Sequence, residues 1–354
     1  IMQSVFAGIQ QVGIGVSDVE QAYQWYKKYF GMDIPMFRDS AEAKLMVRYT
    51  GGEAHRRTAY LALNVAGGAG FEIWQYTSRK PQPASFPITL STAGIVAVKM
   101  KTRSLTQAAN FFENQHVNLL QKNLEDNSFK SLWLTDPYGN LFQCVEDENW
   151  FAEPLSAAST GGVVGAVIAV RDMDKALDFY KRVLNLDQVI YDKTGVFEDL
   201  KNVPGGKSNL RRVLLTQSKG VTGAFSRMLG PSQIELICTD ECKEQPHSFA
   251  NRYWGDLGYI HLCFDTIGMK AHENNCEALG YPLTVNSAGA FDMGEAAGQF
   301  TYNEDPDGTL LEYVETFKIP MLKSIGWYLD LRKRDSMKPL PNWMLKTLRF
   351  NREK

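Results

Sequence analysis

The chain has 354 residues, of which 44% are hydrophobic and 22% charged, and its formal net charge at pH 7 is -2. This composition is typical of a globular protein long enough for two domains, and a net charge so close to zero provides no basic surface for nucleic acid. We therefore expect a small-molecule substrate and no nucleic-acid partner.

The cysteines and the apolar stretches bear on the compartment. Five cysteines, an odd number, are spread over predicted strands and helices, which fits a reducing compartment better than a disulfide framework. The longest apolar stretch, 163–170, is far too short to cross a bilayer. We expect a cytoplasmic protein with no membrane partner, and the oligomeric state stays open, with a homodimer as one option.

The first predicted elements are a strand over residues 11–16 and the helix after it. Apolar residues alternate along the strand, so one face is apolar and the other, which carries Gln11, is nearly bare. Asp18 is placed to cap the helix, Ala22 and Tyr26 belong to its buried stripe, and Gly31 ends it.

This opening returns later in the chain. Residues 11–32 resemble residues 165–186, and a constant offset of 154 positions relates Asp18 to Asp172 and Tyr26 to Tyr180. Two further segments, 134–147 and 303–316, each contain a DPxG turn followed by a predicted strand. Self-similarity over so long a period indicates a duplicated architecture.

Each half also contains a second set of strand, helix and strands, beginning at 94–102 and at 258–266. The chain thus reads as four modules in an N-terminal domain, 8–150, and a C-terminal domain, 160–317, followed by a basic tail, 318–354. We expect the tail to form a helix packed back on the domains; the alternative is a helix lying on a membrane surface.

Taken together, the capped helix with its AxxFY-like stripe and the closing DPxG strand resemble the vicinal oxygen chelate superfamily, which includes glyoxalase I, bleomycin-resistance proteins and extradiol dioxygenases. The resemblance covers roughly residues 8–316. It implies an α+β fold in which four βαβββ modules pair into two open, eight-stranded, barrel-like domains.

The resemblance also implies metal-ligand positions in the first and last strands of each module. The N-terminal half places Gln11, Glu72, Ala97 and Gln143 there, and the C-terminal half places Gly165, Glu235, His261 and Glu312. The second set suits a divalent ion (Fe, Mn, Co, Zn or Mg) held by His261, Glu312 and Glu235. For the glutamines and for Glu72 we favour a polar lining without metal. Which modules pair, within or between halves, stays open and would regroup these candidates.

The residues support this placement in their own right. Alternation in 258–266 puts His261 and Tyr259 on the face away from the helix, which makes Tyr259 a candidate for substrate contact. Glu312 and Glu235 also fall on inner faces, where a carboxylate is costly unless it is paired or bound to metal. Arg211 and Arg212 are candidates for contact with an anionic substrate; the alternative is that they are strand-edge arginines.

We expect a metal-assisted proton transfer, of lyase or isomerase type, on a small substrate with adjacent oxygens. His261 and Glu312 would be ligands, Glu235 a ligand or the base, and Tyr302, which precedes the DPxG turn, a second catalytic residue. Two alternatives stay open. One is an extradiol or keto-acid dioxygenase with an altered iron site, since Gly165 stands where dioxygenases have a histidine; the other is a non-catalytic binding protein of the bleomycin-resistance kind.

Overall fold

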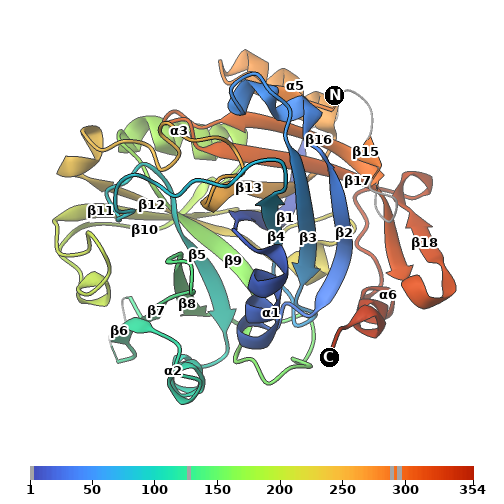
Figure 1. Ribbon diagram of the computed structural model, residues 1–354, viewed down its shortest axis with the longest axis horizontal. Helices are drawn as coiled ribbons and strands as arrows, with labels where there is room; N and C mark the ends of the chain where they lie inside the picture. Colours follow the sequence, from blue (N-terminus) through green and yellow to red (C-terminus); the bar gives the residue numbers. More distant parts are fainter. Residues whose placement is uncertain (1–3, 126–128, 288–290, 293–296) are drawn as a thin grey trace.

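The computed structural model describes residues 4–125, 129–287, 291–292 and 297–354. It contains four modules, each of which begins with a long strand and a helix (Figure 1). The four pairs of opening elements are β1 (Val5–Gly15) with α1 (Val19–Phe30), β5 (Gly94–Thr102) with α2 (Leu105–Asn114), β9 (Thr160–Ala169) with α3 (Met173–Val183), and β13 (Gly258–Ile267) with α5 (Met269–Ala278).

Further strands complete each module. They are β2 (Ile34–Glu42), β3 (Arg56–Leu63) and β4 (Gly70–Tyr76) in the first module; β6 (Leu119–Asn123), β7 (Ser131–Thr135) and β8 (Leu141–Glu146) in the second; β10 (Gln188–Gly195), β11 (Leu210–Thr216) and β12 (Gln233–Thr239) in the third; and β14 (Val285–Asn286), β15 (Phe291–Asp292), β16 (Ala297–Glu304) and β17 (Leu310–Leu322) in the fourth. The expected α+β fold of four modules is confirmed.

The modules pair between the halves of the chain. The first sheet runs β14-β16-β17-β13-β1-β4-β3-β2 and so joins the first module to the fourth, whereas the second runs β10-β11-β12-β9-β5-β8-β7-β6 and joins the third to the second. Antiparallel contacts of β1 with β13 and of β9 with β5 make the two joints. The expected units 8–150 and 160–317 are corrected in this respect, because each curled sheet draws on both of them.

The predicted caps of α1 and α3 are present. Asp18 accepts a hydrogen bond from the backbone N–H of Gln21 at 2.9 Å, and Asp172 accepts one from Lys175 at 3.1 Å. Gly31 ends α1 with a positive φ of 64°. The inward sides of the helices and the outer faces of both sheets share one apolar core.

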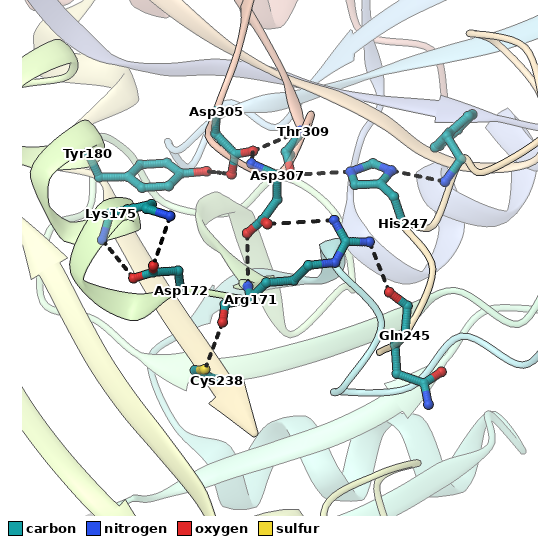
Figure 2. Close-up of polar contacts among 11 residues, drawn as sticks. Arg171, Asp172, Lys175, Tyr180, Cys238, Gln245, His247, Asp305, Asp307 and Thr309 are labelled. Atoms are coloured by element: carbon teal, nitrogen blue, oxygen red, sulfur yellow. Dashed lines mark hydrogen bonds and ion pairs between the residues drawn. The ribbon is translucent and has the colours of Figure 1, made fainter. Parts of the chain in front are cut away.

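The repeated tyrosine and the DPxG aspartate meet across the two sheets. Tyr26 donates from its hydroxyl to Asp136 at 2.6 Å, which links the first module to the second, and Tyr180 donates to Asp305 at 3.0 Å, which links the third to the fourth. Figure 2 shows the second bond, with the Asp305 carboxylate also facing the turn at Thr309. Asp136 and Asp305 are thus turn residues that also hold the modules together.

The tail packs against the first sheet. It begins as a hairpin in which β18 (Trp327–Asp330) pairs with β17, and only α6 (Asn342–Lys346) is α-helical. Leu345 and Leu348 are buried against β2 and β17, close to the short helix α4 (Ser226–Leu229). Packing on the domains is as expected, although the tail is helical only in part. In the part of the chain that the structure describes, no helix has the length and apolar character needed to cross a membrane.

Candidate metal centre

Three buried side chains converge on the inner face of the first sheet. Nε2 of His261 lies 3.0 Å from a carboxylate oxygen of Glu312 and 3.3 Å from one of Glu72. One potential ligand atom from each residue lies within 4.8 Å of the other two. His261 is fully buried, and the two glutamates are 8% exposed or less. One imidazole and two carboxylates at this spacing can hold a divalent cation.

Strand geometry brings the three side chains together. His261 lies on β13, Glu312 on the neighbouring β17 and Glu72 on β4, while β1 runs between β13 and β4. Gly13 of β1 is the register partner of both His261 and Glu72. A Cβ at this glycine would lie 2.5 Å from Cε1 of His261, so the bare face predicted for this strand makes room for the imidazole.

Two polar side chains complete the surroundings. The Gln11 amide donates to Glu72 over 3.4 Å, so its oxygen is a candidate fourth ligand. The Tyr302 hydroxyl lies 3.4 Å from Nδ1 of His261, the ring nitrogen that faces away from the carboxylates. Through this contact Tyr302 positions the imidazole, and it lines the cavity beside its register partner Glu312.

The two buried carboxylates create a negative potential at His261 that favours a positive charge there. Burial opposes protonation of His261, but the carboxylates of Glu312 and Glu72 outweigh it and raise the pKa of the imidazole to about 10. Even so, Nε2 of His261 and Oε2 of Glu312 are buried with no hydrogen bond of acceptable geometry. Unpaired buried polar atoms are costly, and a bound cation would satisfy both atoms at once. The residues present therefore fit a divalent metal ion.

Glu235 is not part of this group. It lies on β12 in the second sheet, where its carboxylate accepts from Lys99 at 2.8 Å and from Arg212 at 2.5 Å. Burial alone would raise its pKa, but the two cations lower it to about 2. The expected grouping of Glu235 with His261 and Glu312 is corrected, because pairing of modules across the halves puts Glu72 in its place.

On the inner face of the second sheet, a buried ion pair occupies the place that corresponds to the metal group. In the second sheet Val167 takes the position that Gly13 has in the first, and Ala97 takes the position of His261. The imidazole is therefore missing, and the Val167 side chain occupies part of its space. Lys99 lies two residues beyond Ala97 and brings its ammonium to Glu235. Both residues are almost fully buried, which means that the protein itself supplies the cation.

The predicted substrate contacts also lie elsewhere. The consecutive residues Gly13 and Ile14 of β1 pair with His261 and Tyr259, so β13 contains a bulge that leaves Ile260 over and breaks its alternation. Tyr259 therefore faces the helix-side core, where its hydroxyl donates to the carbonyl of Leu141 at 2.6 Å. Arg212 is held by Asp199 and Glu235, and Arg211 by exposed acids on the other face of the same strand. None of the three reaches the metal group, so we correct their assignment to substrate contact.

A cavity of about 310 Å³ opens beside the metal group and is lined by Glu72 and Glu312. Its walls also include Gln11, Tyr302 and Arg57, and the remainder is mostly apolar. Sequence reasoning missed the full role of Glu72 and Gln11, since it took their half of the chain as one domain. The informative signal was Lys99, which alternates with Ala97 along β5 and so falls on the inner face of the second sheet, where its charge neutralises Glu235.

Comparisons with known proteins agree with this fold. Residues 8–144 match the model of the Glyoxalase/Bleomycin resistance protein/Dioxygenase superfamily. A putative dioxygenase from Bacillus subtilis is similar in structure, with a TM-score of 0.57, 13% identity and coverage of 88% of this chain and 86% of that one. Glyoxalase I from Zea mays is also similar, with a TM-score of 0.52, 13% identity and coverage of 88% and 92%. No curated protein sequence matches significantly.

Proposed function

We propose that this protein is a metal-dependent enzyme of lyase or isomerase type that moves a proton on a substrate with two adjacent oxygens. The proposal starts from the match of residues 8–144 to the Glyoxalase/Bleomycin resistance protein/Dioxygenase superfamily. The observation that carries this proposal is the buried group of Glu72, His261 and Glu312 beside a cavity, in which Nε2 of His261 and Oε2 of Glu312 lie 3.0 Å apart without a hydrogen bond. Members of the superfamily use divalent metals, and these three residues, with the Gln11 amide, would hold the ion.

A divalent ion bound there would polarise two neighbouring substrate oxygens and stabilise negative charge developing on them. The chain supplies the proton acceptor: the carboxylates of Glu72 and Glu312 both line the cavity, and either can take a proton from a carbon next to a bound carbonyl. The Tyr302 hydroxyl, 3.4 Å from Nδ1 of the imidazole, fixes the orientation of His261.

The two alternatives have less support. An iron oxygenase site of the common type needs two histidines and one carboxylate, whereas the group here has one histidine and two carboxylates. A binding protein without catalysis would need no buried carboxylate facing the cavity as a proton acceptor. The ligand set therefore favours proton transfer.

The test is hydrogen exchange. Protein loaded with Mn²⁺ is incubated in D₂O with hydroxyketones such as 2-hydroxyacetophenone, and loss of the signal from the carbon next to the carbonyl is followed by proton NMR. We expect exchange at least about 100-fold faster than with metal-free protein. Glu72→Gln and Glu312→Gln are compared after reconstitution to equal Mn²⁺ content, because each residue is also a ligand. The variant that loses exchange although Mn²⁺ is bound identifies the base. Equal rates with and without metal for every hydroxyketone would contradict the proposal.

A further inference from the structure

The cavity beside the metal group has a polar end and an apolar end. Acidic and amide groups gather at Glu72, Glu312 and Gln11. Leu61 of β3 is the register partner of Glu72. Leu63 lies two residues further along the same face of β3 and belongs to an apolar region. That region is formed by Met36, Leu63, Phe225, Met228, Ile319 and Leu348.

Four separate parts of the chain close this apolar end. β2 and β3 supply one wall, Ile319 of β17 a second, and Phe225 and Met228 at α4 a third. Leu348, 1% exposed, comes from the tail. The tail is fixed there, because Arg38 pairs with Glu353 at 2.7 Å and the backbone N–H of Glu353 donates to the carbonyl of Asp33 at 2.8 Å. The apolar end is therefore a built feature with a defined depth.

The buried part of the lining offers no free positive charge to a substrate. Among the described lining residues the cations are Arg57 and Lys44. Arg57 is paired with Asp39 at 2.6 Å, and Lys44 lies 3.8 Å from Glu42. With a divalent ion balancing Glu72 and Glu312, the charges along the cavity cancel. A multiply charged anionic substrate would lose its hydration without gaining a partner.

Resting on the proposed function, we infer that the substrate carries an uncharged hydrocarbon substituent next to its two adjacent oxygens. The oxygens bind at the metal group, and the substituent extends past Leu63 into the apolar end. Leu348 of the tail and Met228 of α4 limit its length. They are specificity residues, because they contact the substituent and not the reacting atoms.

A homologous series tests this inference. 1-Hydroxy-2-alkanones from hydroxyacetone to 1-hydroxy-2-decanone are titrated into Mn²⁺-loaded protein by calorimetry. Affinity should rise about fourfold per methylene until the apolar end is full, and then level off. A hydroxyketone of equal length ending in a carboxylate should bind at least about tenfold more weakly. Affinity independent of chain length, or tighter binding of the carboxylate-ended compound, would overturn the inference.

Variants locate the closed end. Leu348→Ala should move the plateau to chains longer by about two methylenes, and Met228→Ala should do the same if the first variant folds poorly. Leu345→Ala is the matched control, since Leu345 is equally buried in the same apolar cluster but does not line the cavity. A plateau that stays in place in both lining variants, or that moves equally in the control, would overturn the assignment.

A second arm separates this inference from the proposed function. Straight-chain alcohols of the same lengths, which cannot chelate, are titrated into metal-free protein. A chain-length dependence there supports the apolar end even if no metal binds, and its absence counts against the apolar end. Chelation of hydroxyacetone by metal-loaded protein without any dependence on chain length would leave the metal centre standing and remove the hydrocarbon substrate.

Discussion

At the scale of residues, one glycine decides where an imidazole fits. Gly13 faces His261 across β1 and β13, whereas the equivalent positions of the second sheet hold Val167 and Ala97. The exchange of large and small side chains between the two sheets keeps both inner faces filled. The His261 imidazole therefore fits opposite β1 because residue 13 is a glycine.

Gly13→Ala tests this dependence. The added methyl would lie 2.5 Å from the His261 ring, so the imidazole must move away from Glu72 and Glu312. We expect affinity for Mn²⁺ or Zn²⁺ to fall by about 10- to 100-fold, as measured by competition with a chelator. Gly195→Ala is the control, because a Cβ at Gly195 meets no atom within 4 Å. Unchanged affinity in Gly13→Ala would show that the imidazole is not a ligand.

For Glu235 we expect an effect on stability and none on metal binding. Its pKa is lowered to about 2 in the folded protein, so its ionisation stabilises the fold above its unfolded pKa of about 4.5, and this stability is lost as the pH falls toward 2. Glu235→Gln should therefore lower the free energy of unfolding at pH 7 by roughly 3 kcal/mol. In denaturant titrations the difference should shrink below pH 4.5, and metal content should stay the same. A loss of metal would return Glu235 to the metal centre.

At the scale of elements, the tyrosine and aspartate pairs hold modules from different sheets. Tyr26 with Asp136 and Tyr180 with Asp305 are buried, and burial together with the neighbouring carboxylate raises the pKa of each phenol well above its usual value. Both phenols stay protonated and keep donating. The repeat thus preserves a pair of bonds that spans the two sheets.

Removing either hydroxyl leaves a buried carboxylate with one donor fewer. We expect Tyr26→Phe and Tyr180→Phe each to lower the free energy of unfolding by about 1.5–3 kcal/mol in urea titrations. Tyr328→Phe, at a side chain 37% exposed, should change it by less than about 0.5 kcal/mol. Equal effects at all three positions would mean that the buried bonds add nothing specific.

The elements were predictable where the signal is local. The caps at Asp18 and Asp172, the buried stripe of α1 and the inward direction of His261 and Glu312 follow from spacing alone. Two features did not follow. The bulge that turns Tyr259 away depends on register against another strand, and the choice of Glu72 over Glu235 depends on which modules pair. Contacts between distant segments decide both, and no local pattern records them.

At the scale of the whole molecule, the two sheets have diverged in use. The inner face of the first sheet encloses the cavity and the metal group, whereas that of the second carries an apolar cluster that includes Trp133, Phe197 and Leu200, beside the pair of Lys99 and Glu235. The candidate site therefore belongs to the first sheet, whereas the inner face of the second sheet is packed with buried side chains. The tail belongs to the first, since it seals the apolar end of the cavity.

Removal of residues 341–354 should expose that end. It takes away Leu345 and Leu348, each of which is at most 1% exposed. We expect the free energy of unfolding to fall by about 3–5 kcal/mol and the fluorescence of a bound anilinonaphthalene dye to rise, with circular dichroism nearly unchanged. A truncated chain as stable as the full one, with no added dye binding, would contradict the packing of the tail.

Elemental analysis of protein purified without chelators decides whether the group of Glu72, His261 and Glu312 holds a metal ion. We expect one divalent metal ion per chain, which is lost in His261→Ala and retained in Glu235→Gln. A full complement of metal in His261→Ala, or no metal even after reconstitution with Mn²⁺, Zn²⁺ or Fe²⁺, would contradict this expectation.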